Sequence, residues 1–267
     1  MMIMFNFSNE EIIYVKGKNI EYIQFKRLLK YNIKHCYTLK GENINFSHNS
    51  EHEKESYSKI CNELKIDEET LVKPIQTHTS IIKCIDEVIE SENLQDVDGL
   101  ITNQKDIALT TKNADCILFL FYDPVKKVIA NVHSGWKGTF QKIAEKTVVK
   151  MINYYKCNLK DIICCISPSI RKCHFEVDSD VKELCEDIFK FTGKIEEFIE
   201  IGEIKEGKQK YLIDTVQINK ILLMELGLKE KNIIDCNLCS ICNEEKINSR
   251  RNEGTGFKLA TAIISMI

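Results

Sequence analysis

The sequence predicts a single domain of the α/β (α+β) class, with a mixed β-sheet core and helices packed outside. Short apolar runs rich in branched and aromatic residues alternate with longer segments of helical periodicity, and no repeat, low-complexity tract or linker interrupts them. A chain of 267 residues with 43% hydrophobic residues can bury a sizeable core. We therefore expect one domain over residues 1–267 that folds without disulfide bonds.

The first half of the chain is predicted to form mainly strands. Short apolar runs bounded by glycine or polar residues occur at residues 12–15, 35–39, 71–75, 81–85, 100–102 and 107–110. Residues 57–64 instead carry apolar side chains at helical spacing, after a polar loop over residues 41–54. His78 falls between two of the strands, so we expect it at the tip or edge of a β element.

The second half of the chain alternates strands with helices. Strands are predicted at residues 116–122, 128–133, 161–166 and 233–236. Helices are predicted at residues 140–155, 181–191 and 213–226, with a last helix between residue 256 and the C-terminus. The charged, glycine-punctuated segment 196–209 is interpreted as an exposed excursion.

The charge balance provides no general attraction for nucleic acid or an anionic membrane. The 37 basic and 40 acidic residues give a net charge of −3, so any anion site has to be local. The first residues lack a signal-peptide pattern, and no apolar run approaches a membrane-spanning length. The 12 cysteines are scattered along the chain, as expected for reduced thiols. We expect a cytoplasmic monomer or homodimer.

The most informative stretch is a predicted hairpin over residues 113–138. Asp123 and Pro124 are typical turn residues between its two strands. If Asp123 pairs with Lys126 across the turn, the same register brings Cys116 opposite His133. Directly opposed side chains have Cβ atoms about 4.5–5.5 Å apart, close enough to share a metal ion or to form a thiolate–imidazole pair. A core cysteine beside a histidine that ends a strand is the simpler alternative.

His78 extends this pair to a possible site with two histidines and one cysteine. Three-ligand sites with an open fourth position are typical of catalytic rather than structural zinc. The separations of His78, Cys116 and His133 along the chain match no local ligand motif, so the residues alone support the site only weakly.

A second cysteine group is the C-x2-C-x2-C run of Cys236, Cys239 and Cys242. The run resembles part of an iron–sulfur ligand set. No Cys-Pro follows it and no partner cluster is evident, so inert thiols are the favoured interpretation.

Local anion sites and acid–base residues have several candidates. Arg250 and Arg251 precede a glycine-rich turn and either bind phosphate or form a solvated charge pair. Lys137 lies at a predicted helix N-terminus, which also favours an anion. Asp115 enters a buried strand, where a charged residue is usually paired or functional. Trp136 stacks on a base or anchors the core.

Six motifs carry a resemblance to a known family. They are Gln76-Thr77-His78, Asp98-Gly99-Leu100-Ile101-Thr102, Ala114-Asp115-Cys116, His133-Ser134-Gly135-Trp136-Lys137-Gly138, Ser167-Pro168-Ser169-Ile170 with Cys173-His174-Phe175-Glu176-Val177, and Arg250-Arg251 with Gly254-Thr255-Gly256. The set resembles the YfiH-type laccase-domain family, also called multicopper polyphenol oxidase-like proteins, from about His35 to near the C-terminus. Its members are described as purine nucleoside phosphorylases with adenosine deaminase activity.

The resemblance implies a metal, a reaction and a set of residues. It places zinc ligands at His78, Cys116 and His133, with copper the less favoured metal. It implies phosphorolysis of adenosine, inosine and methylthioadenosine to a base and ribose 1-phosphate, and deamination of adenosine. The implied catalytic residues are Asp115, Cys116 and His133. The candidate residues for binding the purine nucleoside and phosphate are Lys40, Gln76, Lys137, Arg250 and Arg251.

The chain departs from the family pattern at positions around the candidate phosphate site. Lys40 and Lys137 stand where the family usually has arginine. Further departures from the usual residues are Ser167, Arg171, Asn252 and Phe257. The metal triad is intact. Two other functions stay open at this point: a metal-free cysteine hydrolase or deamidase using Cys116 and His133, and a copper oxidoreductase acting on phenols.

Overall fold

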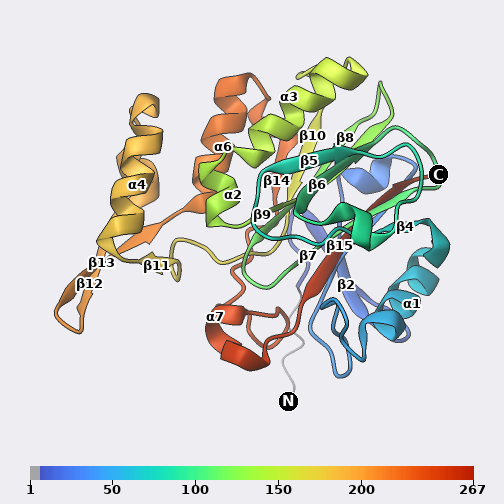
Figure 1. Ribbon diagram of the computed structural model, residues 1–267, viewed down its shortest axis with the longest axis horizontal. Helices are drawn as coiled ribbons and strands as arrows, with labels where there is room; N and C mark the ends of the chain where they lie inside the picture. Colours follow the sequence, from blue (N-terminus) through green and yellow to red (C-terminus); the bar gives the residue numbers. More distant parts are fainter. Residues whose placement is uncertain (1–6) are drawn as a thin grey trace.

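The computed structural model describes residues 7–267 and contains two six-stranded sheets and one three-stranded sheet (Figure 1). The first six-stranded sheet has the order β1-β2-β3-β15-β7-β4, antiparallel except for the β4–β7 pair. Its strands are β1 (Ile12–Lys16), β2 (Glu21–Phe25), β3 (Ile33–Thr38), β15 (Ala260–Met266), β7 (Ala108–Asn113) and β4 (Leu71–Val72).

The second six-stranded sheet has the order β14-β10-β8-β9-β6-β5, with parallel pairs at its two edges and antiparallel pairs between them. Its strands are β14 (Ile233–Asp235), β10 (Ile163–Ile166), β8 (Ile117–Asp123), β9 (Val128–Ser134), β6 (Val97–Thr102) and β5 (Ile81–Cys84). The predicted mixed sheet is confirmed, although it is divided into two layers.

The main core lies between these two sheets. Leu118 and Leu120 of β8 belong to one buried cluster with Leu109 of β7 and Ile264 of β15. Both faces of β8 are covered, so its run ILFLFYD is apolar without alternation, as expected for a fully buried strand. Burial of each large apolar side chain contributes about 1.5–3 kcal/mol to the stability of the fold. The two packed sheets therefore give the side chains at the strand ends a rigid support.

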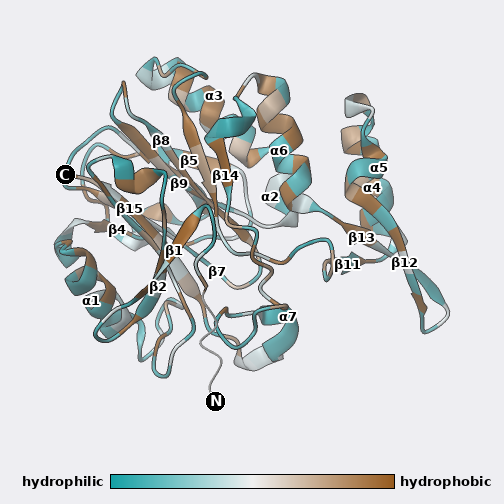
Figure 2. Cartoon of the chain, turned by 180° about the vertical axis from the view of Figure 1, so that it is seen from behind, coloured by the Kyte–Doolittle hydropathy of each residue, from teal (hydrophilic) through white to brown (hydrophobic). Residues whose placement is uncertain are grey.

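Helices cover the outer face of each large sheet (Figures 1 and 2). Helix α1 (Glu53–Leu64) packs its apolar face on the first sheet. Helices α2 (Trp136–Phe140), α3 (Ile143–Tyr155) and α6 (Thr215–Leu226) cover the second sheet. Residues 140–155 were predicted as one helix, but the chain breaks between α2 and α3 because Lys142 has φ 59°.

The third sheet and its helices project to one side (Figure 1). The sheet has the order β11 (Glu176–Val177), β13 (Lys208–Ile213) and β12 (Ile199–Lys205), and it is accompanied by α4 (Ser179–Phe189) and α5 (Ile195–Phe198). These elements share a small apolar cluster with α6. Segment 196–209 is largely exposed, as predicted: it contains the end of α5 and the hairpin of β12 and β13, whose register shifts between Ile201 and Ile204.

The last segment corrects the sequence prediction most clearly. Residues 260–266 form β15 between β3 and β7 and not the predicted terminal helix, because this apolar, β-branched run is buried on both sides of the first sheet. The glycine-rich segment before it contains the short helix α7 (Arg250–Glu253). Single 3₁₀ turns occur at Leu28–Lys30, Glu68–Thr70, Ser91–Leu94, Lys190–Thr192, Glu230–Asn232 and Gly254–Gly256.

Among the described residues, the helices are all too short or too polar to cross a membrane. The prediction that the first residues lack a signal peptide concerns residues 1–6 in part, and these lie outside the described part of the chain.

Candidate metal centre

The hairpin of β8 and β9 has a register two residues away from the predicted one. Asp123 pairs with Val128 and His133 pairs with Leu118, so Cys116 is not directly opposite His133. The turn is longer because the Asp123 carboxylate accepts the N–H groups of Val125 and Lys126. A shift of two residues preserves the face of each side chain, so Cys116 and His133 still lie on the same side of the sheet.

His78, Cys116 and His133 form one cluster at the end of the second sheet. One ligand atom from each lies within 4.8 Å of the others, and Cys116 Sγ is 3.7 Å from His78 Nε2. The two imidazole rings meet edge to face with their centroids 4.9 Å apart. Two imidazole nitrogens and a thiolate suit zinc, and three ligands leave a coordination position open. The donor set therefore fits the metal that the motifs implied.

A strained loop presents His78 to this cluster. His78 has φ 66°, which non-glycine residues adopt uncommonly. The Asp98 carboxylate holds the loop by accepting the N–H groups of Thr77, His78 and Thr79 at 3.2, 3.1 and 2.8 Å. One buried carboxylate thus compensates the unusual backbone conformation.

The same carboxylate orients His133. Nδ1–H of His133 donates to Asp98 Oδ1 at 2.7 Å, so Nε2 is the ring nitrogen through which His133 could bind a metal. Asp98 has no exposed surface. Burial alone would raise its pKa, but the hydrogen bonds and charge of His133 and the Thr79 contacts lower it. Asp98 was not among the predicted site residues, although it lies in one of the six motifs; its burial in β6 is typical of a paired or functional carboxylate.

Gly135 is required where the histidine loop approaches the hairpin. A Cβ added at Gly135 would lie 2.7 Å from Cδ2 of His78 and 3.2 Å from Sγ of Cys116. The absence of a side chain at this position therefore allows the ligands to converge.

Cys116 and His133 influence each other's charge. Burial alone would raise the pKa of the Cys116 thiol, but the charge of His133 and hydrogen bonds from both histidines lower it to about 6. Burial would lower the pKa of His133, yet the Cys116 thiolate and Asp98 raise it to about 9. Cys116 is consequently poised as a thiolate, the form that binds metal or attacks an electrophile.

Two cavities open beside Cys116 and share His78, Ala114, Cys116 and Arg250 as lining residues. The first cavity measures about 240 Å³ and is also lined by His48, Gln76, Lys112, Asn113, His133 and Phe257. The second measures about 410 Å³ and is also lined by Asp115, Ser134, Trp136, Phe175, Thr215 and Arg251. A group bound at the triad would therefore face both cavities.

The other predicted site residues divide into those that line these cavities and those that do not. Gln76 borders the first cavity and exchanges two hydrogen bonds with the backbone of Lys112. Lys40 pairs with Glu253 at 2.7 Å and lines a different cavity. Lys137 is exposed, lies over the Trp136 ring and lines neither cavity.

Asp115 has a structural task beside the cluster. Asp115 lies between β7 and β8 and has φ 80°. Its carboxylate accepts Ser240 Oγ–H at 2.6 Å and the N–H of Arg251 at 2.8 Å. These contacts connect the residue before Cys116 to the segment that carries Arg250 and Arg251. Asp115 thereby positions the basic segment along the second cavity.

Lys112 is a cation that the motifs did not reveal. It lines the first cavity, is only 7% exposed, and lies 3.7 Å from Glu53. Burial is the main cause that lowers its pKa. Nothing in the sequence singles it out, because Lys112 follows two threonines and precedes Asn113; only the structure shows that this part of β7 is buried.

The C-x2-C-x2-C run is divided by the fold. Cys236 is buried beside Arg171, whereas Cys239 and Cys242 join Cys173 and His174 in a second group of potential ligands. A partner cluster therefore exists, contrary to the expectation from the sequence, because β10 and β14 are neighbours and their following loops meet.

The fold and site define a class of two-layer α/β protein with a His-Cys-His cluster at the end of a buried sheet. The chain belongs to the multi-copper polyphenol oxidoreductase laccase family, whose model matches residues 37–265. The resemblance predicted from the motifs is confirmed. Two solved structures share the fold: YfiH from Bacillus licheniformis (TM-score 0.84, 23% identity, 95% of this chain and 99% of that chain) and YlmD from Geobacillus stearothermophilus (TM-score 0.83, 20% identity, 96% and 99%).

Similar curated proteins carry the name purine nucleoside phosphorylase. The one from Clostridium acetobutylicum is 31% identical over 214 residues, which are 79% of this chain and 82% of that protein. The one from Bacteroides thetaiotaomicron is 31% identical over 193 residues, 70% of this chain and 69% of that protein. Mouse LACC1 is 32% identical over 183 residues, 67% of this chain, and the match spans 40% of its length.

Proposed function

We propose that the protein is a zinc-dependent purine nucleoside phosphorylase of the cytoplasm that also deaminates adenosine. Its substrates would be adenosine, inosine and methylthioadenosine, each converted with phosphate to a free base and a ribose 1-phosphate. The observation that carries the proposal is the His78–Cys116–His133 cluster, whose open side faces two cavities lined by basic and aromatic residues. The names of the curated relatives support the same reaction.

The three ligands would hold the metal in a fixed geometry. Asp98 keeps His133 in the tautomer with a free Nε2, and the same carboxylate fixes the backbone of His78. Zinc bound there would supply a Lewis acid and an acidified water molecule. Cys116 would contribute its thiolate charge, so it would serve as a ligand and not as a nucleophile.

Phosphate would be held by the cations that border the cavities. Arg250 borders both cavities, Lys112 the first and Arg251 the second. Guanidinium groups match phosphate oxygens with paired hydrogen bonds. In phosphorolysis, a phosphate oxygen forms the new bond to C1′ of the ribose while the C1′–N9 bond breaks, and the base leaves with the electron pair and takes up a proton. Arg250, which borders both cavities, would hold a phosphate next to a nucleoside in the neighbouring cavity.

The larger cavity is the better place for the nucleoside. Its volume of about 410 Å³ lies within the usual range of about 300–1,000 Å³ for small-molecule sites. Trp136 and Phe175 provide aromatic surface in its wall, against which a purine can pack. The negative charge of Asp115 stands in the same wall and would favour the cationic character that the ribose acquires.

The proposal is tested by metal analysis and by product analysis. Purified protein is expected to contain zinc, to release adenine from adenosine only when phosphate is present, and to form inosine without phosphate. Protein without zinc that leaves adenosine unchanged under both conditions would overturn the proposal. Copper in place of zinc, with oxidation of phenols, would favour the oxidoreductase alternative.

A metal-free cysteine hydrolase is the second candidate. It is favoured by the contact of Cys116 with His133, which lowers the pKa of the thiol to about 6. A chelator distinguishes the two functions: it should abolish turnover by the zinc enzyme and leave turnover by a cysteine hydrolase intact.

A further inference from the structure

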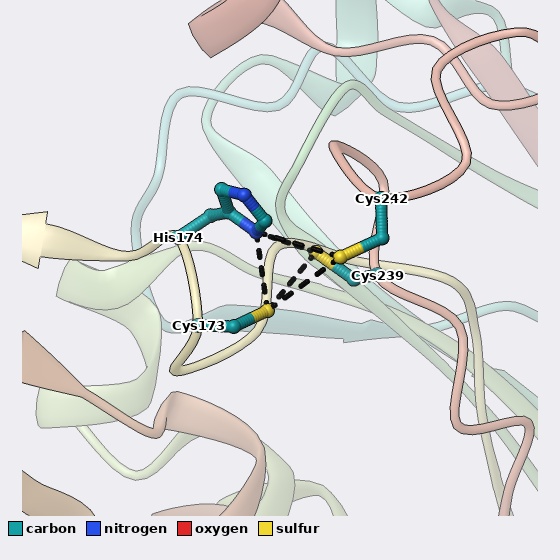
Figure 3. Close-up of side chains that lie close together, drawn as sticks. All are labelled: Cys173, His174, Cys239 and Cys242. Atoms are coloured by element: carbon teal, nitrogen blue, oxygen red, sulfur yellow. Dashed lines mark hydrogen bonds between the residues drawn. The ribbon is translucent and has the colours of Figure 1, made fainter.

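A second cluster of potential metal ligands is formed by Cys173, His174, Cys239 and Cys242 (Figure 3). Cys173 and His174 come from the segment between β10 and β11, and Cys239 and Cys242 come from the loop after β14. The four side chains point toward one another, and one ligand atom from each lies within 4.8 Å of the others.

The distances match the edges of a tetrahedron around one ion. A zinc ion with Zn–S bonds of about 2.3 Å and a Zn–N bond of about 2.0–2.1 Å separates its sulfur ligands by about 3.8 Å and sulfur from nitrogen by about 3.5 Å. Cys173 Sγ lies 3.6 Å from Cys239 Sγ and 3.9 Å from Cys242 Sγ. His174 Nδ1 lies 3.1, 3.6 and 3.6 Å from the sulfurs of Cys173, Cys239 and Cys242.

We propose that Cys173, His174, Cys239 and Cys242 bind one structural zinc ion. Four protein ligands complete the tetrahedron, which is the pattern of structural rather than catalytic zinc. An iron–sulfur cluster fits less well, because its thiolates bind different iron atoms and Cys236 stands apart from the group. A disulfide requires a sulfur separation of about 2.05 Å, much shorter than the 3.6 and 3.9 Å found here.

The proposed ion would join two loops that form part of the candidate active site. The backbones of these loops already meet, since Ser169 donates to Leu238 and Ser240 donates to Ser169. Ser240 also donates to Asp115, the residue before Cys116. His174 directly precedes Phe175, which lines the second cavity. Zinc at this site would therefore hold the cavity wall in place without touching a substrate.

The site goes beyond the proposed function, and its metal content can be measured independently. We would determine zinc per chain in the wild type and in the variants Cys242→Ser, Cys116→Ser and Cys84→Ser. Cys84 belongs to neither cluster and serves as the matched control. Cys242→Ser is expected to contain one zinc ion fewer than the wild type, whatever the content of the other site. Equal zinc in a folded Cys242→Ser variant would overturn the proposal.

A measurement on the wild type covers the case in which the variant fails to fold. Cys173 and Cys242 are exposed, so iodoacetamide can reach both thiols when no metal is bound. Bound zinc is expected to slow their alkylation by about tenfold or more until a chelator is added, as read by peptide mass spectrometry. Alkylation at the same rate with and without chelator, or a disulfide between two of these cysteines, would overturn the proposal.

Discussion

The two Cys/His clusters differ in the number of ligands and in what supports them. The triad of His78, Cys116 and His133 stands at the end of a buried sheet and faces two cavities. The cluster of four lies on two loops, and two of its cysteines are exposed. Three ligands on a rigid base leave a position for a reactant, whereas four ligands on loops leave none. Similar side chains can thus serve chemistry in one place and loop attachment in the other.

The surroundings of the two clusters reinforce this difference. Asp98 has no exposed surface, and its carboxylate accepts hydrogen bonds from His133 and from the loop that carries His78. The second cluster is instead surrounded by backbone contacts between the loops it joins. Substitutions in the first should change catalysis, and substitutions in the second should change stability.

The largest loss of activity is expected from Cys116→Ala. Loss of the thiolate would remove one ligand of the proposed zinc site, and Lewis-acid catalysis is worth several kcal/mol, so phosphorolysis should fall by at least about 100-fold. The rates of base release and the zinc content would be measured together. The control Cys84→Ala should retain the wild-type rate of base release and the wild-type zinc content. An active, zinc-free Cys116→Ala variant would contradict the proposed role of the triad.

Asp98→Asn is expected to have the next largest effect. The amide can no longer accept all the hydrogen bonds that fix His133 and the loop of His78, and loss of such an outer partner typically costs about 10–100-fold in metal affinity or activity. Zinc affinity would be measured by titration with a competing chelator. Asp106→Asn is the matched control, because Asp106 is exposed and lines a different cavity from those at the triad. Equal effects of the two changes would show that Asp98 has no special connection to the metal.

Arg250→Ala tests which cations hold phosphate. Arg250 borders both cavities, so its loss should raise the KM for phosphate by roughly 10–150-fold, which corresponds to the 1.5–3 kcal/mol of a charge-assisted hydrogen bond. Lys40→Ala should leave this KM unchanged, because Lys40 pairs with Glu253 outside both cavities. Unchanged dependence on phosphate in Arg250→Ala would remove Arg250 from the site.

The two clusters also differ in how far the sequence could predict them. The triad was identified because its residues lie in recognisable motifs, and the two-residue error in hairpin register did not change the faces of Cys116 and His133. The second cluster joins residues up to 69 positions apart. The pair Cys173-His174 and the pair Cys239 and Cys242 are both visible in the sequence, but only the pairing of β10 with β14 brings them together.

The fold shows the same limit in its strands. Buried strands at residues 117–123 and 128–134 were predictable from short apolar runs, because their type follows from local composition. The last run, β15, was wrongly predicted as a helix. Its place between β3 and β7 depends on residues far away in the sequence, which no local pattern contains.

The smallest effect on chemistry, with the clearest effect on stability, is expected from Cys242→Ser. An ion present at about 1,000 times its dissociation constant stabilises the folded state by about 4 kcal/mol, which for a chain of this size corresponds to a Tm lower by roughly 10 °C when it is lost. Activity at low temperature should fall only a few-fold, because the triad and Arg250 stay in place.

Thermal unfolding with and without a chelator measures this difference. The chelator should lower the Tm of the wild type and of Cys84→Ser more than that of Cys242→Ser, which can lose only the ion proposed at the triad. A Cys242→Ser variant with unchanged Tm and a hundredfold loss of activity would reverse the comparison, because the loop cluster would then serve catalysis and not attachment. A Cys242→Ser variant with a low Tm and nearly full activity at low temperature would instead support the comparison. The triad would then be active without the ion proposed to join the neighbouring loops.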